Sequence, residues 1–371
     1  MTAERVGRFF DRNTLARLAF YLEAPFGVLS ADGAFPCDAS DPPPNGSVVR
    51  TVDGAVVEVL AKPSGRWAGD ADWRESDHTM ARSRVSALRL RQRAKRAVAR
   101  FFDEAGFLEV DTPAAVPSPG LDLHLDAFGV ADAQRWLITS PEYQMKRLLT
   151  GIDQPIWQLA RCFRKDEHGP QHEPEFLMIE WYRRNAAMDA VMADTEALVY
   201  GVATAVLPEG EAEAFGGPWP RRTVGELFKT HTGAPPPDDE EPFFRLWVEQ
   251  IEPAFEPEPF FVIGWPASMA SLARVEDGVA LRFEAYVRGV ELCNGFDELV
   301  DAAEQRARLE RDHAERARRG RPTYPIDERF LGALEEGLPP SAGNALGFER
   351  LLMVLTGESI DRCVALPSPR L

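Results

Sequence analysis

An arginine, several carboxylates, two histidines and aromatic rings crowd into CFRKDEHGPQHEPEFLMIEWY, residues 162–182, between two runs typical of buried strands. Because side chains alternate between the faces of a strand, Phe176, Glu180 and Tyr182 share one face of the second run. Arg164 ends the first run above small side chains, so it has room for a ligand, and its planar fork fits a phosphate or a carboxylate. The pattern leaves open an ion pair between this arginine and a nearby glutamate.

A second charged group lies in RFEAYVRGVELCNGFDEL, residues 282–299. A turn at Arg288-Gly289 predicts two antiparallel strands on which Glu284 and Glu291 approach each other. Clustered carboxylates need a cation between them. Mg²⁺ fits, because proteins hold it by one or two carboxylates together with substrate phosphates. Salt bridges to the two arginines of the segment are the alternative. Three further side chains alternate onto one face: Asn294, Phe296 and Glu298.

The third segment is GNALGFERLLMVLTG, residues 343–357, which we interpret as a turn entering an apolar helix. Backbone N–H groups at such a helix start can face an anion. Arg350 falls in the first turn, where the helix dipole disfavours a cation unless an anionic ligand shares the site. Together, the three segments indicate arginines that bind polyphosphate, carboxylates that hold magnesium and an aromatic plate for a base.

The elements that must position these residues alternate between strand and helix. A helical pattern runs from about Met80 to Gly106, a plausible C-terminal cap. In TSPEYQMKRLLTG, Ser140 is a good N-cap and Pro141 suits the first helical position, which puts Glu142 in the first turn. Residues 301–320 predict a highly charged, solvated helix.

Composition restricts the function classes. The 371 residues have 44% hydrophobic and 27% charged side chains, typical of a soluble globular protein, and no apolar run is long enough for a transmembrane helix. The N-terminus lacks the apolar core of a secretion signal, so we expect a cytoplasmic protein without membrane partners. The four cysteines are scattered without metal spacing and are interpreted as buried thiols.

Charge is distributed unevenly along the chain. The net charge of −17 disfavours nucleic-acid binding, yet residues 82–100 contain eight arginines or lysines and no acid. This run predicts either a solvated helix face or a docking patch for an acidic macromolecule, which charge reversal at Arg89, Arg91 and Arg93 would test. Residues 1–75 predict a small β-rich appendage with Asp-Gly turns, and in the remainder of the chain strands alternate with helices.

Several motifs resemble those of class II aminoacyl-tRNA synthetases. FRKDEHGPQHEPEF is similar to motif 2, GNALGFERLLM to motif 3, and FLEVDTP to motif 1. Within the class, SPEYQMKRLL, FEAYVRGVELCNGFDEL and WPASMASLA resemble lysyl-tRNA synthetases, and most closely the compact branch that joins β-lysine to elongation factor P. The resemblance covers about residues 82–371. It implies an α+β catalytic domain over residues 76–371 with an antiparallel sheet flanked by helices. It also implies a homodimer, and ATP and Mg²⁺ as cofactors. The N-terminal appendage then becomes a possible reduced OB-like barrel.

The resemblance also implies roles for individual residues. Arg164 would contact the α-phosphate and the substrate carboxylate, Phe176 would stack on adenine, and Asp166 would hydrogen-bond to it. His172 and Arg350 would hold the β- and γ-phosphates, while Glu284 and Glu291 would bind Mg²⁺ and ATP. The amino-acid pocket would be lined by Ser140, Glu142, Glu180, Tyr182, Asn294, Phe296, Glu298 and Ala345. Its glutamates suit a dicationic amino acid such as lysine.

Two residues favour the elongation factor P branch. Ala345 stands where synthetases acting on tRNA usually have glycine, and Ser140 also matches the branch.

Four positions depart from the family pattern: Lys165 and Asp166 in motif 2, Glu173 in place of asparagine, and Glu349 in place of aspartate. Glu173 puts a negative charge near the triphosphate, which Lys165 would have to compensate.

The resemblance therefore implies ATP-dependent activation of lysine or β-lysine as an aminoacyl-adenylate, and transfer to a lysine side chain of elongation factor P. Transfer to tRNA or to a small-molecule amine is an alternative, although the short N-terminal region makes tRNA a less suitable partner. A synthetase-like sensor that binds an amino acid without chemistry is the third hypothesis, and the departures in motif 2 favour it.

Overall fold

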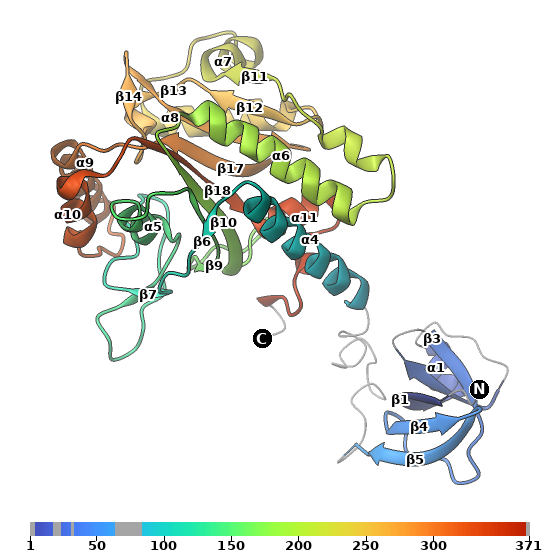
Figure 1. Cartoon of the computed structure of the whole chain (residues 1–371). Coiled ribbons are helices and arrows are strands. Elements are labelled where there is room, and N and C mark those ends of the chain that lie inside the picture. Colours follow the sequence, from blue (N-terminus) through green and yellow to red (C-terminus); the bar gives the residue numbers. More distant parts are fainter. Residues whose placement is uncertain (1–3, 18–23, 31–32, 64–83, 369–371) are drawn as a thin grey trace. The chain divides into compact units, whose positions relative to one another are not determined.

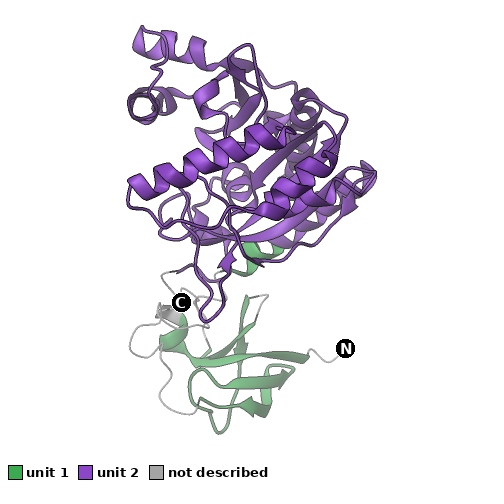
Figure 2. Ribbon diagram, turned by 90° about the vertical axis from the view of Figure 1, so that its left-hand side faces the viewer, with its two compact units in different colours: residues 1–89 green, residues 90–371 purple. Residues whose placement is uncertain are grey.

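The computed structural model describes residues 4–17, 24–30, 33–63 and 84–368. The chain divides into two compact units, residues 1–89 and 90–371, which Figure 2 colours separately. The predicted boundary between residues 75 and 76 lies outside the described residues and stays a prediction.

Unit 1 is β-rich, as the sequence predicted. Its antiparallel sheet has the order β3-β2-β1-β4-β5, and a short helix, α1 (Arg12–Arg17), follows the first strand. The strands are β1 (Glu4–Asp11), β2 (Phe26–Ser30), β3 (Gly33–Cys37), β4 (Val48–Val52) and β5 (Ala55–Ala61) (Figure 1). Asp53 and Gly54 form the turn between β4 and β5, and both have positive φ angles. The OB-like character stays a prediction.

The centre of unit 2 is an eight-stranded sheet in the order β11-β12-β16-β17-β18-β10-β9-β6. Neighbouring strands are antiparallel except for the pairs β6–β9 and β11–β12. The strands are β6 (Leu108–Glu109), β9 (Ile156–Phe163), β10 (Glu175–Arg184), β11 (Arg221–Thr223), β12 (Phe260–Ile263), β16 (Arg282–Val287), β17 (Val290–Asp297) and β18 (Ser341–Gly347). Two small sheets lie outside it: β7 (Ala115–Val116) with β8 (Trp136–Leu137), and β13 (Trp265–Pro266), β14 (Val275–Glu276) and β15 (Val279–Ala280).

Helices α4 (Val85–Glu104), α6 (Met188–Val206) and α11 (Phe348–Thr356) lie along one face of this sheet (Figure 1). Their apolar sides bury Leu177, Ile179 and Trp181 of β10. The alternate residues of β10 point to the opposite face, as the strand period predicted. The remaining helices are α5 (Glu142–Leu148), α7 (Val224–Thr232), α8 (Glu240–Leu246), α9 (Ala302–Arg318), α10 (Glu328–Gly337) and α12 (Ile360–Cys363).

The register of the sheet places the predicted site residues in one row. Glu284 of β16 is opposite Asn294, Asn294 is opposite Ala345, Ala345 is opposite Glu180, and Glu180 is opposite Gln158 of β9. Residues directly opposite in neighbouring strands project from the same face. Segments more than a hundred residues apart in the chain therefore contribute side chains to one surface.

Local structure agrees with several sequence predictions. Arg288 and Gly289 form the two-residue turn between β16 and β17, and both have positive φ. Gly106, with φ of +75°, follows the end of α4. The hydroxyl of Ser140 accepts a hydrogen bond from the Glu142 N–H at 3.2 Å, although α5 begins at Glu142, one residue later than predicted. All four cysteines are buried.

The prediction of a turn at the GNALG segment was wrong. This segment is the central strand β18, and its Gly343 leaves room for the Tyr182 ring of the neighbouring strand. Helix α9 is charged and largely solvated as predicted, but its Arg316 is fully buried and donates hydrogen bonds to the carbonyl oxygens of Leu125 and Pro322. Among the described residues, no helix combines the length and the apolar character needed to span a membrane.

Candidate active site

A cavity of about 460 Å³ opens on the face of the sheet opposite α4, α6 and α11. Eleven of the fifteen predicted site residues line it: Ser140, Glu142, Arg164, His172, Phe176, Glu284, Glu291, Asn294, Phe296, Ala345 and Arg350. Glu180, Tyr182 and Glu298 are buried and bond to the lining residues or their neighbours. Asp166 is exposed and is not part of the lining.

One end of the cavity is cationic. Arg350, in the first turn of α11, lies with its guanidinium nitrogen 2.6 Å from His172 Nε2. Arg350 also donates to the Glu291 carbonyl oxygen at 2.8 Å and lies 3.6 Å from the Glu291 carboxylate. Burial and the guanidinium of Arg350 lower the pKa of His172. A neutral His172 beside Arg350 forms a group that can donate hydrogen bonds to anionic oxygens.

Arg164 follows the end of β9, and its guanidinium lies 5.0 Å from the centre of the Phe176 ring. This cation–π contact covers one side of the ring and fixes Phe176 as an aromatic plate. Arg164 also forms a 3.7 Å ion pair with Glu167, the alternative that the sequence left open. The pair is only partly buried, so a stronger anion such as a phosphate can compete for the arginine.

Two carboxylates face the cavity on β16 and β17. Glu284 is buried and Glu291 is half-buried. Burial raises the pKa of Glu284 to about 7, Arg282 lowers it, and the nearby charge of Glu291 raises it again. Arg282 is ion-paired with Glu284 and donates to Asn294 at 3.1 Å. The salt bridge proposed as an alternative is therefore present at the predicted metal site.

The donor set at Glu284 and Glu291 is suited to a hard cation but does not enclose one. Among the described residues no group of three or more His, Cys, Asp or Glu side chains is arranged to hold a metal ion. Mg²⁺ commonly takes one or two protein carboxylates and completes its shell with water and phosphate oxygens. The two glutamates thus fit Mg²⁺ that arrives with a nucleotide.

The opposite end of the cavity is acidic. Ser140 donates to Glu180 at 2.8 Å, and Tyr182 donates to the other oxygen of Glu180 at 2.7 Å. Burial and, secondarily, the charge of Glu142 raise the pKa of Glu180 to about 8. Burial likewise raises the pKa of Glu298 to about 8, against the lowering effect of Lys146. Buried carboxylates of this kind favour a bound ammonium group.

Close packing shapes the pocket floor. Gly343 of β18 lies opposite Tyr182 on one side and Phe296 on the other. A Cβ at Gly343 would come within 2.4 Å of the Tyr182 ring. Glycine therefore lets the ring lie flat across β18. The next residue on the same face, Ala345, does carry a methyl group, between Glu180 and Asn294.

Two departures from the family pattern have structural partners. Glu349 is buried; it forms a 2.6 Å ion pair with Arg91 and accepts a 2.8 Å hydrogen bond from the Leu177 N–H. Glu173 is also buried and accepts hydrogen bonds from the backbone N–H and the hydroxyl of Ser368. The C-terminal segment therefore binds the Glu173 carboxylate, whereas the sequence analysis required Lys165 for this purpose.

Two residues at the site, Lys146 and Glu167, were missed in the sequence analysis. Lys146 lies between Glu142 and Glu298, and its spacing of four from Glu142 on a helix was a usable signal. Arg282, which the sequence analysis considered only as a salt-bridge alternative to a metal, shares a strand face with Glu284. Glu167 lines the cavity beside the exposed Asp166, and nothing in the loop sequence distinguishes the two.

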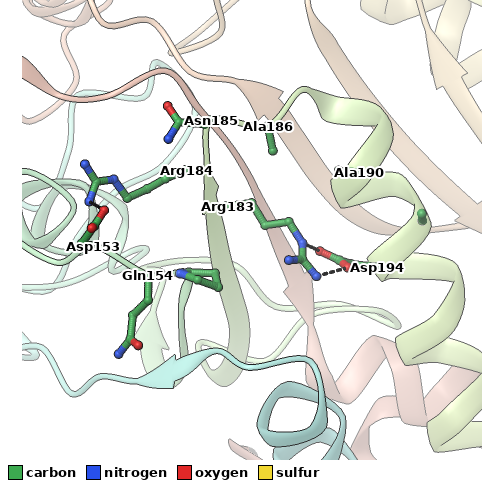
Figure 3. A pocket seen from close by; sticks show the side chains of 10 residues that line it. Asp153, Gln154, Arg183, Arg184, Asn185, Ala186, Ala190 and Asp194 are labelled. Carbon is green, nitrogen blue, oxygen red and sulfur yellow. Dashed lines mark hydrogen bonds and ion pairs between the residues drawn. The ribbon is translucent and has the colours of Figure 1, made fainter.

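A second hollow, of about 570 Å³, lies where β10 meets the start of α6. Figure 3 shows Arg183 directed at Asp194 and Arg184 directed at Asp153. The two ion pairs measure 2.6 and 2.8 Å. No predicted site residue lines this hollow, and its arginines already have carboxylate partners, so it is a poorer candidate for an active site.

Comparison with known proteins agrees with this geometry. Residues 74–370 match the family described as tRNA synthetases class II (D, K and N). The chain is 41% identical over 294 residues to the elongation factor P–(R)-β-lysine ligase of Edwardsiella ictaluri, covering 72% of this chain and 90% of that protein. The ligase of the same name from Proteus mirabilis is 39% identical over 325 residues, covering 80% and 98%. That from Vibrio cholerae is 37% identical over 338 residues, covering 81% and 99%.

The match extends over the sheet, the cavity and all three predicted motifs, and the relatives are covered almost completely. The fold agrees as well, because the antiparallel sheet flanked by helices is the architecture that the resemblance implied. The chain therefore belongs to the class II tRNA synthetase family of the D, K and N type.

Proposed function

We propose that the protein is an ATP-dependent ligase that activates (R)-β-lysine, or lysine, and transfers it to a lysine side chain of elongation factor P. One observation carries the proposal: a single cavity has guanidinium groups at one end and buried carboxylates at the other. The names of the relatives specify the amino acid and the acceptor. The acidic end is suited to the two ammonium groups of such an amino acid.

In the first step, an oxygen of the amino-acid carboxylate attacks the α-phosphorus of ATP. The bond from that phosphorus to the bridging oxygen breaks, which gives the aminoacyl-adenylate and pyrophosphate. Arg164 would hold the substrate carboxylate and the α-phosphate together and stabilise the charge that develops there. Arg350 and His172 would hold the outer phosphates, and Phe176 would stack on the adenine. Positioning and charge stabilisation account for most of the catalysis.

Mg²⁺ would be held by Glu284 and Glu291 together with phosphate oxygens, and it would neutralise negative charge on the triphosphate. Arg282, which is paired with Glu284, keeps that carboxylate oriented towards the cavity. Tyr286 donates to the second oxygen of Glu284 at 2.7 Å and completes this support.

In the second step, the amine nitrogen of the acceptor lysine attacks the acyl carbon of the adenylate. An amide bond forms, the bond to the AMP oxygen breaks and the amine loses a proton. The dicationic substrate would lie with its ammonium groups among Glu142, Glu180 and Glu298. Ser140, Tyr182, Asn294, Phe296 and Ala345 would shape the remainder of the pocket.

Mass spectrometry of purified elongation factor P tests the whole reaction. After incubation with this protein, ATP, Mg²⁺ and each amino acid, we expect a mass increase of one β-lysyl or lysyl group on one lysine. Amino-acid-dependent exchange of pyrophosphate into ATP tests the first step alone. Pyrophosphate exchange without modified elongation factor P would favour tRNA or a small-molecule amine as the acceptor. Absence of exchange with every amino acid would favour the hypothesis of an amino-acid sensor without catalytic activity.

We also propose that the protein acts as a homodimer in the cytoplasm and does not use tRNA. The family resemblance supports the dimer, and the location is the expectation from the sequence. Light scattering on the purified protein tests the dimer, and aminoacylation assays with total tRNA test the acceptor.

A further inference from the structure

A buried lysine lies among the acidic residues next to the cavity. Lys146 of α5 is only 1% exposed, and its ammonium nitrogen lies 2.6 Å from a carboxylate oxygen of Glu142. The same ammonium is ion-paired with Glu298, whose side chain is also 1% exposed. Apart from this pair, no described residue donates a hydrogen bond to either Glu298 oxygen. Burial of a lysine costs free energy unless its charge is paired.

The charges of the cluster can be counted. Glu142, Glu180 and Glu298 carry three negative charges when ionised, and Lys146 carries one positive charge, so the net formal charge is −2. An amino acid of the lysine type brings two ammonium groups, while its carboxylate belongs with Arg164 at the other end. The formal charge of the cluster therefore cancels the charge of the two substrate ammonium groups only when Lys146 is present.

We infer that Lys146 is a positioning residue that sets amino-acid specificity: its ammonium orients Glu142 and Glu298 and fixes the pocket charge at the value that two substrate ammonium groups neutralise. Ring contacts support the position of this lysine. Tyr143 lies three residues before Lys146 in α5 and stacks on Phe330 of α10, with 4.5 Å between the ring centres. The Lys146 ammonium lies 6.0 Å from the centre of the same Phe330 ring. The inference rests on the proposed amino-acid substrate.

The titratable groups that act on Lys146 or share its carboxylate partners come from several elements. α5 contributes Glu142 and Tyr143, β10 contributes Glu180 and Tyr182, and Glu298 follows β17. The charge of Lys146 lowers the pKa of Glu298 and, to a smaller extent, that of Glu180. Loss of this charge must therefore raise the pKa values of both carboxylates further.

Kinetics of pyrophosphate exchange test the inference through Lys146→Met. At pH 7 we expect KM for the amino acid to rise about tenfold or more, with a smaller change in kcat. A tenfold rise corresponds to an increase of about one unit in the pKa of a carboxylate that must ionise before the amino acid binds. The difference in KM between Lys146→Met and the wild type should become smaller as pH rises to 8.5, because Glu180 and Glu298 then ionise in both proteins. Lys146→Met/Glu298→Gln, which removes one charge of each sign, should recover the wild-type pH profile. Lys229→Met, at an exposed lysine of α7, should change nothing.

A loss that is independent of pH, or a double variant no better than Lys146→Met, would overturn the inference and assign Lys146 a purely structural role. Thermal melting without substrate provides a second readout that does not depend on activity. The folded pKa of each buried carboxylate lies above its unfolded value, so stability falls as pH rises from 6 to 9, and Lys146→Met should lose more of it than the wild type. The double variant should lose less than Lys146→Met, because Glu180 remains but Glu298 does not. If wild type shows no exchange but the melting pattern holds, the proposed function fails while the charge balance stands.

Discussion

At the scale of residues, the site depends on buried carboxylates whose affinity for protons is raised. Burial raises the pKa values of Glu180 and Glu298 to about 8, well above that of a carboxyl group in water. A dicationic amino acid binds best to the ionised forms. Proton release and substrate binding are consequently linked at neutral pH.

Calorimetry of amino-acid binding measures this linkage. At pH 7, titrations in two buffers with different ionisation enthalpies should show that protons are released on binding. KM should fall as pH rises from 6 to 8, because fewer carboxylates must lose a proton before the substrate binds. Glu180→Gln, which cannot ionise, should release fewer protons. Proton uptake by the wild type would contradict the assignment of these two groups.

Ala345 provides a test of pocket shape. Its methyl group lies between Glu180 and Asn294, and Ala345→Gly removes it without changing any charge. We expect the preference between β-lysine and lysine to change by about tenfold or more, since one methyl group in a pocket is worth roughly 1–3 kcal/mol. Exchange assays with both amino acids measure the ratio. An unchanged ratio would show that the selectivity resides elsewhere.

At the scale of elements, Glu349 joins three segments that are distant in the sequence. Its carboxylate pairs with Arg91 of α4 and accepts from Leu177 of β10, while its backbone belongs to α11. The helix that carries Arg350 is therefore fixed to the strand that carries Phe176 and Glu180. This buried connection explains why an acidic side chain precedes Arg350.

Glu349→Ala should lower the free energy of unfolding by about 3 kcal/mol, because it leaves Arg91 without its carboxylate partner. Urea unfolding monitored by circular dichroism measures the loss. The control is Glu315→Ala, which removes a carboxylate paired with the exposed Arg318 on α9 and should leave the midpoint nearly unchanged. Equal effects of the two substitutions would contradict the connecting role of Glu349.

At the scale of the whole molecule, an acidic protein carries a basic helix. Within α4, Arg91 is bound to Glu349 and to the Cys363 carbonyl oxygen, and Arg93 donates to the Val206 carbonyl oxygen. Arg91 is therefore unsuitable for the charge-reversal test that the sequence suggested. Arg96 and Arg100 are exposed on the same helix and are the better choice.

If α4 docks an acidic protein acceptor, Arg96→Glu/Arg100→Glu should reduce kcat/KM for acyl transfer about tenfold at low salt. Pyrophosphate exchange should be unaffected, since these residues do not line the cavity. Arg311→Glu/Arg318→Glu, at two exposed arginines of α9, is the charge-matched control. Transfer kinetics identical to wild type would exclude this surface from docking.

The sequence by itself determined the chemistry of the site. The alternation on β10 fixed which face Phe176, Glu180 and Tyr182 share, and the Arg288-Gly289 pair fixed the hairpin of β16 and β17. These features are local, because strand period and turn type depend on neighbouring residues. Predicted site residues therefore reached the cavity with few exceptions.

Only the tertiary structure decided which partners those residues have. Glu173 is bound by Ser368, nearly two hundred positions away, and Glu349 is bound by Arg91, more than two hundred and fifty positions away. The GNALG segment looked like a turn in isolation and is a strand that pairs with β10 and β17, and its Gly343 leaves room for the Tyr182 ring of β10. Such pairings depend on the register of a sheet assembled from distant segments, which no local pattern specifies.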